Sequence, residues 1–293
     1  MDLITKNIRV LLLIISICIS TTVFGEQVRG CILNELKLSE NKDTLLMYTG
    51  NHHIVDLSKY DELSNVRVIG RKAFANNHKL KEIILPHKIH VIGKGAFEGC
   101  EKLIRIYMPD CLEHIEAGAF WECSMLKIDE LPKELKTIGE NAFVKCRNLS
   151  ITEIPNEVTT VGIRAFAYCD NITSIKLPVT LENIPRLIFF KCVNLKNVDI
   201  SENVKYIGHN AFYGCENLRT LFLPRDSCEI EGNPFAKCSR LKKIHISANT
   251  IATAFHGIYG TEILNLNSNS FINYYHNVFR SPKQPKTTRN NQI

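Results

Sequence analysis

The sequence predicts an α/β repeat solenoid, a right-handed coil with a parallel concave sheet and short helical or 3-10 turns. Three observations predict it: phenylalanine, cysteine and leucine columns that each repeat every 23 residues, without an insertion. Registers that coincide over eight copies do not arise by chance, and a period in the twenties is typical of solenoid proteins. The repeated phenylalanines are Phe74, Phe97, Phe120, Phe143, Phe166, Phe189, Phe212 and Phe235.

Each unit combines a strand with a turn. In one copy, Ile83 and Leu85 alternate with polar or solvent positions, which predicts a short strand that Pro86 ends because proline cannot donate to a ladder. After a reversal at Gly93, Phe97 is expected on the short helical or 3-10 turn that closes the coil. Because no unit buries its apolar side alone, neighbouring coils must share one interior.

Two adjacent units depart from the strand pattern. The third and fourth copies place Asp129 and Thr152 where the others have an aliphatic residue, and both carry isoleucine one residue earlier, at Ile128 and Ile151. A slip of one residue turns side chains to the opposite face of a strand. We therefore expect a local bulge or kink here, with the period unchanged.

The chain divides into five segments. Residues 1–25 are expected to be a signal peptide, 26–65 an N-terminal cap, 66–248 the eight repeats, 249–280 a degenerate C-terminal cap repeat, and 281–293 a disordered basic tail. In the N-terminal cap, Leu57 and Tyr60 fall on the columns of Leu80 and Ile83, and Asn51 takes the place of phenylalanine. Degenerate terminal repeats are expected to shield the ends of a stack.

The repeat unit resembles the BspA-like (Treponema pallidum-type) leucine-rich repeat. The resemblance rests on L-x-x-I-x-L-P-x-x-V-x-x-I-G-x-x-A-F-x-x-C-x-x and covers the eight units. Departures include Glu116, Pro185 and Glu231 in place of glycine. The resemblance implies a surface or secreted protein that binds a partner and is linked to adhesion.

The first residues are typical of an export signal. Lys6 and Arg9 precede the apolar run Val10–Ile19, and cleavage after Gly25 fits the small residue there. The run is shorter than the roughly 20 residues of a membrane span. The alternative is an uncleaved anchor, so a membrane is a partner only if this segment is retained. We expect a secreted or cell-surface protein.

Eleven cysteines behind an export signal would ordinarily suggest disulfides. Seven of them, however, occupy one repeat column that begins with Asn77, and parallel side chains suit a disulfide poorly. We expect these cysteines to be reduced and buried, facing the backbone of the turn. The column consists of Cys100, Cys123, Cys146, Cys169, Cys192, Cys215 and Cys238.

One strand position per unit does not obey the repeat consensus, and we expect it to point outward. Its mixture of aromatic, acidic and basic side chains suits a face that binds a partner protein. The alternative is that these are solvent positions free to vary. The eight residues are Ile84, Tyr107, Glu130, Glu153, Lys176, Asp199, Phe222 and His245.

The remaining motifs argue for binding rather than catalysis. A formal net charge of +6 is interspersed along the chain, so no nucleic-acid partner is expected. No catalytic, cofactor or metal-binding motif occurs, so we expect no enzyme and no cofactor. Asn148 and Asn171 lie in glycosylation sequons. The leading hypothesis is a module that binds other proteins, with adhesion as one such role. The alternative is a structural component of a surface layer, and the third hypothesis is an enzyme.

Overall fold

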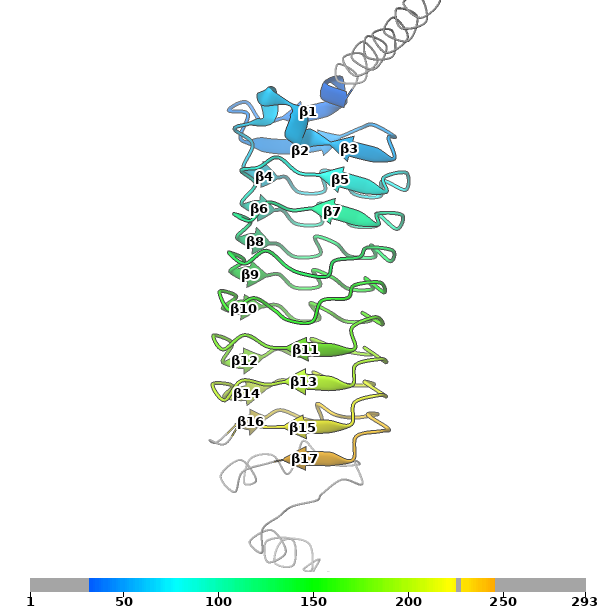
Figure 1. Ribbon diagram of the computed structural model, residues 1–293, viewed down its shortest axis with the longest axis vertical. Helices are drawn as coiled ribbons and strands as arrows, with labels where there is room; N and C mark the ends of the chain where they lie inside the picture. The colour runs from blue at the N-terminus through cyan, green and yellow to red at the C-terminus, as the bar shows by residue number, and fades with distance from the viewer. Residues whose placement is uncertain (1–31, 225–227, 246–293) are drawn as a thin grey trace, which may run out of the picture.

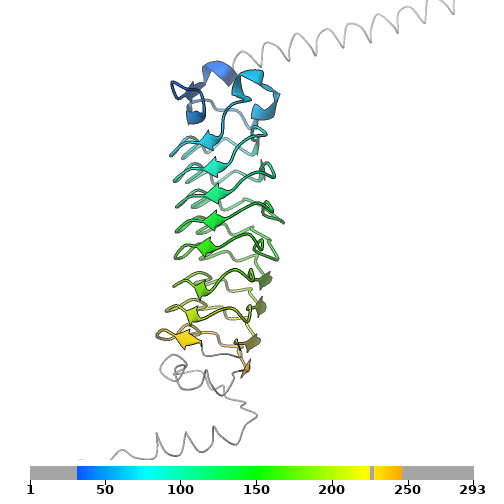
Figure 2. The same ribbon diagram turned by 90° about the vertical axis from the view of Figure 1, so that its left-hand side faces the viewer.

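A computed structural model describes residues 32–224 and 228–245. These residues form a β-solenoid of about nine coils with parallel sheets and very little helix. The coils lie one above another in an elongated stack, with the N-terminal cap at one end (Figures 1 and 2). The signal segment 1–25, the C-terminal cap repeat 249–280 and the tail 281–293 lie outside the described residues.

Seven strands occupy the position that the repeat predicts, one in each of seven coils, and we call these the front strands. Their middle residue is buried and parallel pairing keeps it in register, as for Ile83 opposite Ile106. The front strands are β3 (Ile54–Asp56), β5 (Glu82–Ile84), β7 (Arg105–Tyr107), β11 (Ser174–Lys176), β13 (Asn197–Asp199), β15 (Thr220–Phe222) and β17 (Lys243–His245).

A second parallel column of strands, which we call the side strands, was not expected. Each side strand after β2 is only two residues long and ends in a buried aliphatic residue, as in β6, where Ile92 is buried. The strands are β2 (Thr44–Tyr48), β4 (Val68–Ile69), β6 (Val91–Ile92), β8 (His114–Ile115), β9 (Thr137–Ile138), β10 (Thr160–Val161), β12 (Asn183–Ile184), β14 (Tyr206–Ile207) and β16 (Glu229–Ile230). At the cap, β1 (Leu36–Leu38) pairs antiparallel with β2.

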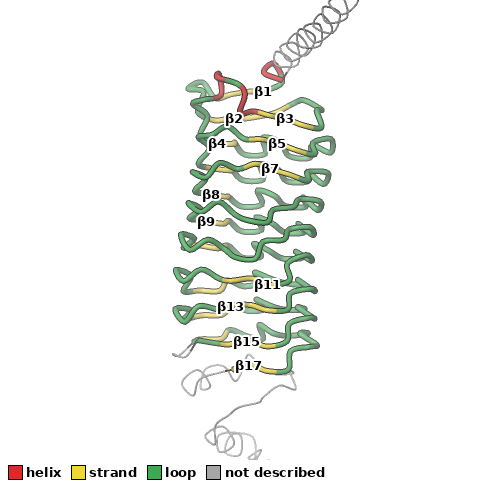
Figure 3. Tube along the Cα trace, viewed as in Figure 1, coloured by secondary structure: helices red, strands yellow, loops and turns green. Residues whose placement is uncertain are grey.

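The prediction of helical or 3-10 turns is wrong for the described part of the repeats, which contains no helix (Figure 3). The reason is the backbone on either side of the phenylalanine. Arg164 and Tyr168, two residues before and after Phe166, have φ of 57° and 60°. A right-handed helix needs negative φ at consecutive residues, so these left-handed positions confine the phenylalanine to a turn.

The N-terminal cap has a different register from the one expected. Val55, rather than Tyr60, lies opposite Ile83, because the 3-10 helices η1 (Leu57–Lys59) and η2 (Asp61–Leu63) lengthen this coil. Tyr48, rather than Asn51, continues the aromatic row, with its ring 5.2 Å from that of Phe74. The cap is therefore an elongated coil with its own aromatic residue.

The eight repeated phenylalanines form one aligned row in the interior, which confirms the shared core. All are at most 1% exposed. Successive rings lie between 5.0 and 5.8 Å apart and are nearly parallel. Offset stacking at such distances is favourable beyond the burial of apolar area.

The cysteine column lies beside this row, and each thiol donates to the backbone of an earlier coil. Cys146 Sγ lies 3.1 Å from the carbonyl oxygen of Phe120, and the other six thiols repeat the contact. Asn77 makes the equivalent bond to Gly50 through its amide nitrogen. The cysteines of the column are free and buried, as predicted.

Burial makes these thiols poor nucleophiles. It raises the pKa of the Cys100 and Cys192 thiols from 9.0 to about 12, so their thiolate fraction falls about a thousand-fold. We expect iodoacetamide to label the half-buried Cys111 in the native protein and the column only after unfolding. Peptide mass spectrometry reads each cysteine separately. Equal labelling of Cys111 and Cys192 without denaturant would contradict this.

Two of the glycine replacements connect neighbouring coils. Glu116 accepts a hydrogen bond from the Lys94 backbone N–H at 2.8 Å, and Glu231 accepts one from the His209 N–H at 3.1 Å. Bonds from Arg186 and Tyr206 lower the pKa of Glu231 to about 2. These departures from the repeat therefore supply bonds of their own between coils.

The front sheet is interrupted at two places, and the longer interruption lies where the sequence slips; the shorter one separates β13 from β15. No front strand forms at the third and fourth repeats, and the ladder resumes at β11 after a single bridge between Glu153 and Lys176. Ile128 and Ile151 are buried, whereas Asp129 and Thr152 are exposed. The predicted local irregularity is confirmed, and the side strands β8, β9 and β10 continue through it.

Candidate functional site

The front strands carry the row of residues that the sequence singled out. Because only the middle residue of each strand points into the core, the residue that follows it faces outward. Seven of the eight predicted residues are exposed and Ile84 is half-buried. The largest apolar surfaces belong to Tyr107, which is 49% exposed, and Phe222, which is 61% exposed.

Most of these residues are neighbours across coils. Ile84 lies opposite Tyr107, and Lys176 lies between Glu153 and Asp199. At the last described coil, the His245 ring stacks on Phe222 with centroids 4.3 Å apart. Glu130 forms no β-bridge with a described residue of either neighbouring coil, because it lies in the interruption of the sheet.

A second outward row was missed by the sequence analysis. It consists of the residue that precedes the middle of the front strands β5, β7, β11, β13 and β15, and it runs parallel to the predicted row. The strand alternation contained the signal, since a buried centre leaves both flanking residues outside. The second row consists of Glu82, Arg105, Ser174, Asn197 and Thr220. We call the predicted row and the second row together the front face.

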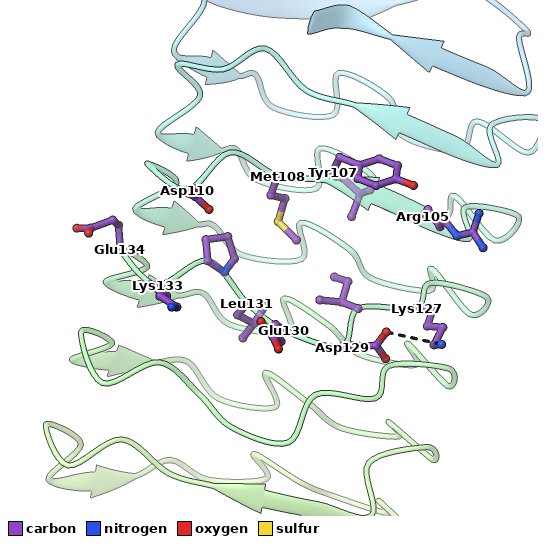
Figure 4. A pocket seen from close by; sticks show the side chains of 13 residues that line it. Arg105, Tyr107, Met108, Asp110, Lys127, Asp129, Glu130, Leu131, Lys133 and Glu134 are labelled. Atoms are coloured by element: carbon purple, nitrogen blue, oxygen red, sulfur yellow. Dashed lines mark ion pairs between the residues drawn. The ribbon is translucent and has the colours of Figure 1, made fainter.

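A groove of about 790 Å³ opens in the front face at the interruption, between β7 and the third repeat (Figure 4). Tyr107 at the end of β7 and Met108 just after it line the groove on one side, and Glu130 and Leu131 line it from the next coil. A pocket of this size is in the range of small-ligand and side-chain sites. The sequence indicated the slip at this place but not the groove.

The charges of the groove divide into paired and unpaired groups. Lys127 pairs with Asp129 at 3.6 Å, and Arg105 pairs with Glu82 at 3.8 Å. The Ser150 hydroxyl, which donates to Asp129, is the main cause that holds the pKa of this carboxyl below its usual value. Among the described residues, Glu130 has no ion pair or side-chain hydrogen bond.

The two sequon asparagines lie on adjacent coils, in the turn that precedes the front-strand position. Both are exposed, and the Asn171 amide donates to the Asn148 carbonyl oxygen at 3.4 Å. Glycosylation of Asn148 and Asn171 stays a prediction.

Two other kinds of site are absent from residues 32–224 and 228–245. No group of three or more His, Cys, Asp or Glu side chains there could hold a metal ion. In the same part of the chain, no helix is long and apolar enough to cross a membrane.

Comparisons with known proteins agree with the repeat. The family model described as BspA type leucine-rich repeat region (6 copies) matches residues 52–172 and 159–284. A solved leucine-rich repeat protein from T. pallidum is 34% identical, with a TM-score of 0.57 over 62% of this chain and 86% of that one. Another from Bacteroides ovatus is 26% identical, with a TM-score of 0.50 over 73% and 70%. A search of curated proteins finds no match.

Proposed function

The chain belongs to the BspA-type leucine-rich repeat family, and from this premise we propose that its front face binds other proteins. The proposal is carried by one observation, the exposure of consensus-free side chains on a regular strand scaffold. Tyr107 and Phe222 are aromatic side chains of the kind that dominates binding energy at protein interfaces. Charged neighbours such as Lys176 and Asp199 would select among partners.

We also propose a secreted or cell-surface location, with adhesion to a host or matrix protein as the role. The support is the basic and apolar N-terminal pattern of the sequence and the family resemblance. The right-handed sense of the coil and the concave shape of the front sheet stay predictions.

The test compares two kinds of exposed aromatic residue. Tyr107 and Phe222 lie on the front face, whereas Trp121, which is 40% exposed, lies beside the buried Phe120 on the turn. The full chain is immobilised and titrated with candidate host or matrix proteins. We expect saturable binding that weakens about ten-fold or more in the Tyr107→Ala/Phe222→Ala variant. Trp121→Ala should leave it unchanged. Equal losses in the two variants, or no saturable partner, would contradict the proposal.

The alternative role is a structural component that stacks with copies of itself. It is favoured by three exposed apolar side chains at the N-terminal cap. Their exposed fractions are 40% for Leu46, 50% for Met47 and 61% for Ile54. Light scattering at high protein concentration separates the roles, since a monomer excludes self-assembly as the function.

A further inference from the structure

The interruption of the front sheet leaves backbone groups of β7 without a strand to pair with on one side. Arg105 and Tyr107 pair with β5 on one side, so Ile106 between them directs its N–H and C=O to the third repeat. In the described structure, the backbone bond that links the two coils here runs from the Lys127 N–H to the Ile104 oxygen, at 2.9 Å. No backbone hydrogen bond between described residues joins Ile106 or Met108 to the third repeat. The groove therefore has an open carbonyl acceptor.

The side chains around this acceptor have a distinct chemistry. The half-exposed Tyr107 ring and the Glu130 carboxylate line the same groove, with Met108 and Leu131 as apolar neighbours (Figure 4). The cations Arg105 and Lys127 already have carboxylate partners. Three carboxylates that line the groove have no ion pair in the described structure, those of Glu130, Asp110 and Glu134. Only one lining ammonium group there is unpaired, that of Lys133. The groove is thus complementary to a cation.

We propose that the groove binds an arginine side chain of a partner protein, an inference that rests on the proposed function of the front face. A guanidinium group has five N–H donors in one plane, enough to bond both the Glu130 carboxylate and the open Ile106 carbonyl. Its flat face stacks on an aromatic ring such as Tyr107. Its methylene stem is apolar and fits beside Met108 and Leu131. Lysine offers a compact charge without the planar face, which favours arginine as the occupant.

The test uses acetyl-Leu-Arg-Leu amide as the probe, titrated into the isotope-labelled full chain and followed by NMR. We expect saturable shifts of the Ile106 and Met108 amide signals. A peptide with citrulline, which keeps the shape and loses the charge, should bind about five-fold or more weakly. Glu130→Gln and Tyr107→Ala should weaken the arginine peptide about as much, whereas Tyr107→Phe should retain binding because the ring remains.

Glu157→Gln is the matched control, because Glu157 is an exposed carboxylate on the fourth repeat that does not line the groove. It should leave the affinity unchanged. Equal affinity for the arginine and citrulline peptides, equal effects of Glu130→Gln and Glu157→Gln, or no shift at Ile106 would each overturn the groove proposal. The front-face function is judged separately: a partner that is lost with Phe222→Ala alone would stand even if the arginine peptide failed to bind.

Discussion

Replacing Phe143 with alanine is expected to lower the free energy of unfolding by about 3–5 kcal/mol. Phe143 is fully buried, and its ring stacks on Phe120 at 5.2 Å and on Phe166 at 5.4 Å. Alanine would remove both contacts and leave a cavity between two coils. Because each coil is stabilised by its neighbours, a gap in the middle of the row weakens two interfaces at once.

Equilibrium urea unfolding of the full chain measures this effect. The control is Phe222→Ala, which deletes the same atoms from a side chain that is 61% exposed. We expect the control to cost less than about 1 kcal/mol, as is usual at exposed positions. If the two variants lost the same free energy, the aligned row could not be the core of the solenoid.

The phenylalanine row shows what the sequence could predict. A column such as Phe120, Phe143 and Phe166 is visible in the sequence because burial demands the same residue in every coil. The front strands follow from the same logic, and β5 was expected within one residue of its observed position. Features that repeat with a strict residue type are therefore accessible from one sequence.

The side strands and the turns were not accessible in this way. A strand of two residues, such as Val91–Ile92, is too short to show a period of two, and its partner lies one coil away. Left-handed positions are ordinarily marked by glycine, but here Tyr168 and Leu187 also adopt them, with φ of 60° and 61°. The turn was consequently mistaken for a helical one.

The candidate site was predicted in part. The outward row containing Tyr107 was found from its departure from the consensus, whereas the row containing Arg105 was overlooked. The slip at Ile128 was visible in the sequence, but the groove that results from it depends on backbone hydrogen bonds that are missing between coils. A groove produced by missing pairs has no sequence pattern of its own.

Replacing Cys146 with aspartate is expected to destabilise the protein by about 3–5 kcal/mol at neutral pH, the usual cost of an unpaired buried charge. Cys146 is fully buried, and its thiol donates to the Phe120 carbonyl oxygen. An ionised carboxylate has no proton to donate, so two acceptors would face each other in the interior. Cys146→Ser should cost only about 1 kcal/mol, because the hydroxyl can still donate to that carbonyl.

The pH dependence separates charge from size. Burial raises the pKa of the introduced aspartate, so the ionisation cost is complete above its folded pKa and disappears as pH falls towards its unfolded value of about 4. The stability deficit of Cys146→Asp relative to Cys146→Asn, which has the same size without the charge, should therefore shrink between pH 7 and pH 4. Urea unfolding at several pH values measures it. A deficit that stays constant over this range would mean that the column position is open to water, because only a group shielded from solvent carries an ionisation penalty that protonation removes.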